Sequence, residues 1–187
     1  MAGREPVRAI AEAEANKDQS REDSIGLNQT GADGNMLQQH DETDQFLREH
    51  GLDLSGEYAQ ALDFAVLEPS ARVLDVATGS GRMVQRLLER GHCVISGDIT
   101  HDALDKARER LSDLANKATL VILDARNMQF ADDSFCSVTL ANAIHEIDNT
   151  SAALREIARV MALNGKLLVV EFSQKGFELM ELRHRMM

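Results

Sequence analysis

The stretch Val73-Leu74-Asp75-Val76-Ala77-Thr78-Gly79-Ser80-Gly81-Arg82 decides the fold of this chain. Its apolar beginning predicts a buried strand over 72–76. Gly79 and Gly81 then predict a tight turn, because glycine adopts positive φ angles without strain. The apolar spacing over 81–90 predicts a helix with one buried face. Strand, glycine turn and helix in this order are typical of the first unit of a doubly wound α/β sheet.

The same alternation of strands and helices continues toward the C-terminus. Further strands are expected at 93–97, 119–123, 137–141 and 166–172, and further helices at 56–67, 101–114 and 151–163. Several strands are apolar on consecutive residues, which is the pattern of a parallel sheet covered on both faces. The predicted fold class is therefore α/β, a doubly wound, Rossmann-like, mostly parallel sheet of five strands.

The first fifty residues differ in composition from the rest. Residues 1–50 are polar and acidic, and we expect an N-terminal arm or lid with helices at 9–15 and 36–50. Residues 51–187 form the predicted globular domain. The net charge of −11 argues against a nucleic-acid partner, and no apolar run has the length of a membrane span. Cys93 and Cys136 stand in apolar stretches, which predicts buried free thiols and a cytoplasmic location.

The glycine turn can serve two classes of ligand. A dinucleotide requires a third glycine, and Val84 stands at that position. Asp75 also precedes the glycines, where its charge would repel a pyrophosphate. The carboxylate could instead hold a cationic amino-acid tail, directly or through water. S-adenosylmethionine (SAM) has such a tail, a sulfonium charge and no phosphate, so the turn favours SAM over a nucleotide-dependent oxidoreductase or a turn without ligand.

Asp75, Ala77, Gly79 and Gly81 resemble motif I of the class I SAM-dependent methyltransferases, D-x-[GA]-x-G-x-G. The resemblance covers about residues 58–172 and is greatest to the small-molecule branch that includes quinone-biosynthesis methyltransferases. It implies an enzyme that transfers a methyl group from SAM to a small-molecule acceptor.

The resemblance also assigns further residues to the cofactor. Asp98, at the end of the second strand, would accept the ribose hydroxyls, with Ile99 beside it in the same site. Asp124 would accept from the adenine amine, and the Ala125 amide would donate to the ring. Asn142 would contact the methionine portion. The simpler alternatives are that Asp98 caps the next helix and that Asp124 is a solvated loop acid.

His145 is the candidate catalytic residue. His145 and Glu146 are the titratable groups that follow the fourth strand, and His145 suits a general base or a substrate anchor. A His-Glu pair also suits the start of a surface helix, which is the structural alternative. No metal site is expected.

Two features depart from the family pattern. Cys136 and Ser137 stand where relatives commonly carry an Asp, at the start of the fourth strand. Only 173–187 follow the fifth strand, enough for one helix with Phe177, Met180 and His184 on one face. We therefore expect the usual C-terminal antiparallel strand pair to be missing, and a second subunit or the N-terminal arm to cover the exposed edge. The short C-terminus also favours the alternative of a non-catalytic SAM-binding or partner-binding module.

Overall fold

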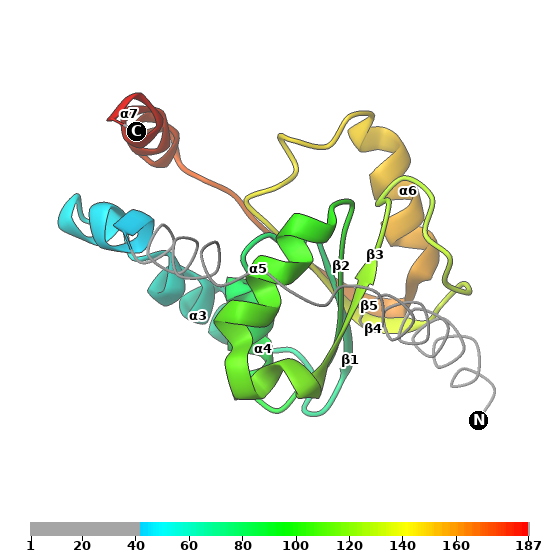
Figure 1. Ribbon diagram of the computed structural model, residues 1–187. Coiled ribbons are helices and arrows are strands. Elements are labelled where there is room, and N and C mark those ends of the chain that lie inside the picture. The colour runs from blue at the N-terminus through cyan, green and yellow to red at the C-terminus, as the bar shows by residue number, and fades with distance from the viewer. Residues whose placement is uncertain (1–41, 187) are drawn as a thin grey trace, which may run out of the picture.

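The computed structural model describes residues 42–186, which form a five-stranded sheet between two layers of helices (Figure 1). The strands are β1 (Arg72–Val76), β2 (Cys93–Asp98), β3 (Ala118–Ile122), β4 (Phe135–Ala141) and β5 (Met161–Val170). They lie in the order β3-β2-β1-β4-β5, and all four pairings are parallel. The predicted fold class is confirmed, and no antiparallel strand pair occurs within 42–186.

The helices cover both faces of this sheet. They are α3 (Leu54–Ala65), α4 (Arg82–Glu89), α5 (His101–Leu111), the short 3-10 helix η1 (Ser112–Lys117), α6 (Thr150–Val160) and α7 (Gln174–Met186). Helices α3, α4 and α5 lie on one side of the sheet and α6 on the other (Figure 1). The expected apolar face of α4 is buried, and Thr100 caps α5 by accepting from the Ala103 amide at 3.2 Å.

The boundary between α6 and β5 was predicted wrongly. The helix expected at 151–163 ends at Val160, and β5 already begins at Met161. Asn164 and Gly165 do not terminate a helix, because they form an irregularity within β5, where the pairing passes from Phe135↔Met161 to Ser137↔Lys166. Asn164 has a φ of 66°, which accommodates the extra residues of the bulge.

The N-terminal helix expected at 36–50 is described from residue 42 onward. Residues 42–49 are helical, and Leu47 is buried against Leu54 and Leu179. This small apolar cluster joins the N-terminal helix to α3 and α7. The helix expected at 9–15, with the rest of 1–41, lies outside the described residues.

The two cysteines are free, as expected, but the prediction that they are buried was wrong. Cys93 is the first residue of β2, and Cys136 alternates with the buried Phe135 and Ser137 on β4. Both cysteines lie at the amino ends of their strands, before the run of consecutive buried residues begins. Among residues 42–186, no helix is both long and apolar enough to cross a bilayer.

Candidate cofactor-binding site

Two adjoining cavities lie along the carboxyl edge of the sheet, with volumes of about 390 and 280 Å³. Ala77, Asp98, Ala143 and Glu146 line both, so the cavities form one continuous trough. The trough crosses the ends of β1 and β4, where the order of the strands reverses direction. Ligands of open α/β sheets bind at this position.

The glycine loop forms one wall of the larger cavity through a run of left-handed backbone. Ala77, Gly79 and Gly81 have φ angles of 62°, 50° and 78°. A Cβ added to Gly81 would lie 3.0 Å from the Cβ of Ala107, so this glycine permits close contact between the loop and α5. A Cβ on Gly79 would meet no atom within 4 Å, and Gly79 lines the cavity. The loop therefore leaves open space for a ligand in front of Gly79.

Asp75 lies beneath this loop and is absent from the walls of both cavities. Its side chain is 1% exposed, and its two carboxylate oxygens accept hydrogen bonds from Ser96 Oγ and Thr139 Oγ1, each at 2.7 Å. Ser96 Oγ also lies 2.7 Å from Thr78 Oγ1, in the loop itself. Burial raises the pKa of Asp75 to about 7, although the two hydrogen bonds act in the opposite direction. The structure thus places Asp75 where it supports the loop from below.

Asp98 stands where the two cavities meet, as one of their shared wall residues. Its Oδ2 accepts from the Gly79 amide at 3.0 Å, and its Oδ1 accepts from the amide and hydroxyl of Thr100, both at 3.1 Å. One carboxylate therefore joins the glycine loop to the start of α5. Ile99, next to it, is 61% exposed at the smaller cavity.

The smaller cavity is formed in part by the segment that follows β3. Asp124 and Ala125 line it, with apolar walls from Leu123 and Ile147. Arg126, to which the sequence analysis gave no role, also lines it and holds the Asp124 carboxylate through Nε and Nη2, both at 2.9 Å. These hydrogen bonds hold the pKa of Asp124 below its usual range. In the sequence, Arg126 is an arginine two residues after an acid. This pattern is common in loops and does not by itself indicate a role in a site.

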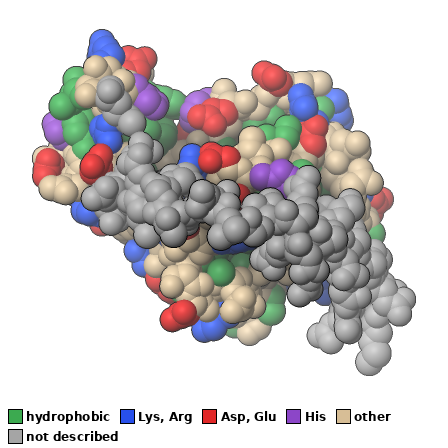
Figure 2. All heavy atoms as spheres, viewed as in Figure 1, with side chains coloured by type: hydrophobic (Ala, Val, Ile, Leu, Met, Phe, Trp, Pro, Cys, Tyr) green, Lys and Arg blue, Asp and Glu red, His purple; other side chains and the backbone are tan. Residues whose placement is uncertain are grey.

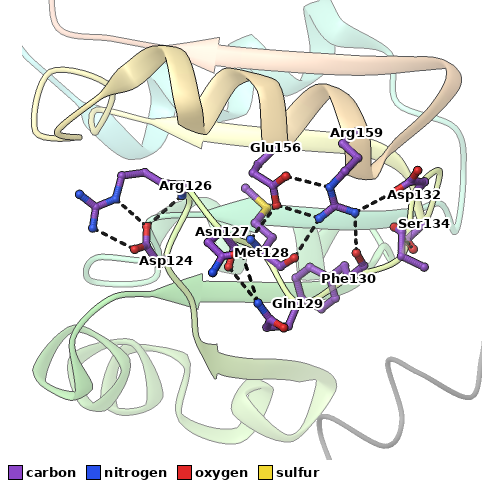
Figure 3. A network of polar contacts seen from close by, with 11 residues as sticks. Asp124, Arg126, Asn127, Met128, Gln129, Phe130, Asp132, Ser134, Glu156 and Arg159 are labelled. Atoms are coloured by element: carbon purple, nitrogen blue, oxygen red, sulfur yellow. Dashed lines mark hydrogen bonds and ion pairs between the residues drawn. The ribbon is translucent and has the colours of Figure 1, made fainter.

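A polar network formed with α6 anchors the connection between β3 and β4 (Figure 3). Arg159 of α6 donates to the carbonyl oxygens of Phe130 at 2.7 Å and Met128 at 2.9 Å. It also pairs with Asp132 and Glu156, both at 2.8 Å. Glu156 accepts in turn from the Met128 amide at 2.8 Å, and the arginine holds the pKa of this glutamate below its usual range. The connection between β3 and β4 is thereby fixed in place without a strand or helix of its own.

Asn142 lies at the opposite end of the trough, in the larger cavity. Its backbone φ is 50°, and its Nδ2 donates to Tyr58 Oη at 2.8 Å. Its Oδ1 is buried and has no hydrogen-bond partner among the described residues. Burial raises the pKa of Tyr58 to about 12, so this phenol stays protonated. The pair offers an unused acceptor to a ligand.

His145 lines the same cavity. It lies in a turn, five residues before α6 begins at Thr150, so it does not start a surface helix. Its Nδ1 is 3.0 Å from Oε2 of Glu171, a residue that the sequence analysis missed. Its ring contacts Phe177 of α7 edge-on, with centroids 4.9 Å apart.

Comparison with known proteins agrees with this geometry. A family model described as a methyltransferase domain matches residues 73–165. These residues are similar to a methyltransferase domain. The ubiquinone/menaquinone biosynthesis C-methyltransferase UbiE of Shewanella frigidimarina is 34% identical over 125 residues, which is 64% of this chain and 49% of the relative. The chain spans about half the length of the curated relatives it matches.

Solved structures show the same fold around these residues. A putative methyltransferase from Bacillus halodurans has a TM-score of 0.60 and 32% identity, covering 63% of this chain and 52% of that one. The glycopeptide N-methyltransferase MtfA, solved with SAM, has a TM-score of 0.51 and 28% identity, covering 60% and 53%.

Residues outside the matched methyltransferase domain close the larger cavity. Leu47 of the helix at 42–49 and Phe177 of α7 contribute to its wall. Asp44, on the same N-terminal helix, forms ion pairs with Arg82 and Arg110. The roles of these charged residues were not predictable from the sequence, because the partners are far apart along the chain. The division of the chain at residue 50 stays a prediction.

Proposed function

We propose that this protein is an enzyme that transfers the methyl group of SAM to a small-molecule acceptor. The observation that carries the proposal is the continuous trough over β1 and β4, with Asp98 at its centre. The glycine loop and Asn142 lie toward one end, and Asp124 with Ala125 toward the other. This arrangement has the linear order of methionine, ribose and adenine in SAM. All these residues lie within the matched methyltransferase domain.

The side chains present fit the three parts of SAM. Asp98 would accept the ribose hydroxyls, with Ile99 beside the adenosine, and the Ala125 amide would donate to the adenine ring. Asn142 Oδ1, buried and without a partner among the described residues, would accept from the ammonium group of the methionine portion. Asp75 would act through Ser96 and the loop, since its carboxylate is not on the cavity wall.

Arg126 affects how the adenine of SAM would bind at Asp124. It occupies both oxygens of Asp124, so an adenine amine would share this acceptor with a guanidinium group. Each carboxylate oxygen has two lone pairs, which makes the shared arrangement feasible. The solved neighbour MtfA, which holds SAM, supports this choice of cofactor.

SAM carries an activated methyl group on its sulfonium. When this methyl group is transferred, the rest of SAM leaves as a neutral thioether. The protein therefore contributes mainly position and the removal of any acceptor proton. The acceptor would lie in the part of the larger cavity next to His145, where Leu47, Phe172 and Met180 provide apolar walls. The name of UbiE supports an acceptor of the quinone class.

Calorimetry with SAM and with S-adenosylhomocysteine tests the cofactor. We expect one site per chain, and an affinity about 10- to 100-fold lower for Asp98→Ala, because a charged hydrogen-bond acceptor is lost. Asp102→Ala is the matched control, since Asp102 is an exposed acid on α5 paired with Lys106. Unchanged SAM affinity in Asp98→Ala, or tight NAD binding without SAM binding, would contradict the proposal.

Methyl transfer is then measured with SAM labelled in the methyl group. The first acceptor is a naphthoquinol that lacks the ring methyl group of menaquinone, as the names of the relatives suggest. SAM binding without transfer to this or related phenols, amines and thiols would favour the alternative, a SAM-binding module without catalytic activity.

We also propose that the free edge of β5 is covered by a second copy of the chain or by the N-terminal arm. Leu163, Leu167 and Val169 of this strand are 87%, 39% and 41% exposed. An edge strand with exposed apolar residues pairs readily with another chain, so natural proteins usually protect it. A homodimer would protect both copies with the same contact.

The surface supports a small-molecule acceptor in preference to a nucleic acid or a membrane. Acidic and basic side chains are interspersed over the face shown in Figure 2, and the net charge is −11. Nucleic-acid binding requires a concentrated basic surface. The free thiols of Cys93 and Cys136 support a cytoplasmic location, where cysteines stay reduced.

A further inference from the structure

We propose that Glu171 orients His145 so that Nε2 of His145 acts as the general base toward the methyl acceptor. The proposal rests on the methyltransferase function above and assigns a positioning residue for its acceptor step. His145 lines the larger cavity, whereas Glu171 is absent from the wall of either cavity and lies in contact with the imidazole.

The sheet brings these two residues together. Ala141 at the end of β4 pairs with Val170 at the end of β5, and the strands are parallel. Glu171 therefore leaves the sheet immediately beside the turn that carries His145. Both residues come from the carboxyl edge, where the trough opens.

The Glu171 carboxylate is held by a backbone amide at one oxygen and faces the His145 imidazole with the other. Its Oε1 accepts from the Phe172 amide at 3.0 Å. Its Oε2 is buried and forms no hydrogen bond with the described residues, but it lies 3.0 Å from Nδ1 of His145 as an ion-pair contact. A buried carboxylate oxygen requires a donor, and Nδ1 of His145 would supply one at this distance if it carried the proton of the neutral imidazole. The remaining nitrogen, Nε2, then has a free lone pair.

Packing fixes the orientation of the ring. His145 meets Phe177 edge-on, at an interplanar angle of 83°, and Phe177 in turn packs against Phe172 at 5.5 Å. The nearest carboxylate to Nε2 that the structure shows is that of Glu146, at 3.8 Å and 77% exposed, which is beyond hydrogen-bond range. Nε2 therefore remains available to an acceptor in the cavity.

This arrangement suits an acceptor whose nucleophile must lose a proton, such as a phenol or quinol. The hydroxyl proton passes to Nε2, and the electron pair released makes the adjacent ring carbon nucleophilic, so that this carbon forms the bond to the methyl carbon. The hydrogen on that ring carbon is then lost as a proton to water, which restores the aromatic ring. The carbon–sulfur bond breaks, and its electrons stay on the sulfur of the departing thioether. Glu171 stabilises the imidazolium that forms, which later releases its proton to water.

Nitrogen-15 NMR of the full chain tests the assignment without an acceptor, because it reports which ring nitrogen carries the proton. The spectra are recorded at alkaline pH, free and with S-adenosylhomocysteine, and His145→Gln identifies the signal among the six histidines. We expect the proton on Nδ1 in the wild type and on Nε2 in Glu171→Ala. Glu146→Ala is the matched control and should leave the proton on Nδ1.

A wild-type ring with its proton on Nε2 would overturn the proposal, and this measurement needs no variant to fold. A proton that stays on Nδ1 in Glu171→Ala would also overturn it. Failure to bind S-adenosylhomocysteine would instead contradict the methyltransferase function, so the two failures are distinguishable. With an active acceptor, we expect Glu171→Ala to lower kcat about 10- to 100-fold while the KM for SAM changes less than about 2-fold. An unchanged kcat would contradict the role of Glu171.

Discussion

The Asp75 carboxyl group is removed from water and satisfied by two hydroxyl groups, those of Ser96 and Thr139. Its pKa of about 7 means that the group changes charge near neutral pH, directly beneath the glycine loop. Ser96 also contacts Thr78, so the charge on Asp75 is coupled to the loop through a single hydroxyl. A buried acid with a raised pKa favours the folded state most when it is protonated, whereas an acid paired with a cation favours the folded state most when it is ionised.

We expect the free energy of unfolding to fall as the pH rises from about 4 to about 7 because of Asp75. The unfolded chain releases this proton near pH 4, whereas the folded chain keeps it until its raised pKa is passed. The slope from this one group is at most about 1.4 kcal/mol per pH unit, and it vanishes above the folded pKa. Asp75→Asn removes the titration, so urea unfolding of both proteins across this pH range should give diverging curves. Parallel curves would contradict the raised pKa.

At the scale of elements, the helix at 42–49 is attached to the domain by charge as well as by Leu47. Asp44 accepts from Arg82 at the start of α4 and from Arg110 near the end of α5, and the three side chains are 12–15% exposed. Arg82 also donates to Ser80 Oγ at 2.8 Å. One carboxylate therefore links the N-terminal helix, two core helices and the glycine loop.

Asp44→Ala should lower the free energy of unfolding by about 1–3 kcal/mol, because two largely buried guanidinium groups lose this carboxylate. The amides of residues 42–49 should also exchange faster with deuterium, since the Leu47 cluster and the pair of Glu42 with Arg183 would then hold the helix without Asp44. Asp105→Ala is the control, because the pair of Asp105 with Arg108 is exposed and should contribute less than about 0.5 kcal/mol. Equal effects of the two substitutions would show that Asp44 is not the attachment.

At the scale of the whole molecule, the sheet ends at β5 with one edge and part of one face uncovered by residues 42–186. Strand β3 forms the other edge, and α5 packs beside it. The two edge strands of the sheet therefore differ in how well they are covered. The exposed apolar side chains Leu163, Leu167 and Val169 all lie on β5.

Sedimentation velocity of the full chain tests whether a second copy covers this edge. We expect a dimer for the wild type and a monomer for the double variant Leu167→Lys with Val169→Lys, since charge on an edge strand opposes pairing. Leu154→Lys on α6, where the leucine is 39% exposed, is the control and should remain dimeric. A monomeric wild type whose β5 amides exchange rapidly would contradict both a dimer and a covering N-terminal arm.

Much of the sheet was predictable because its signals are local. Consecutive apolar residues mark β1, and the spacing of Met83, Val84, Leu87 and Leu88 marks the buried face of α4. The end of α6 was missed because Asn164 and Gly165 are equally suited to a helix end and to a strand bulge. Pairing with β4 decides between the two, and that pairing depends on residues far away in the sequence.

The sequence by itself determined that Asp75, Asp98, Asp124 and Asn142 lie close to the carboxyl ends of four strands. A parallel sheet necessarily brings such positions to one edge, so the location of the site followed from local patterns. Only the tertiary structure decided that Asp75 is buried beneath the loop and that Glu171 meets His145. Those outcomes depend on which strands and helices become neighbours, and contacts between distant segments leave no periodic signal in the sequence around either partner.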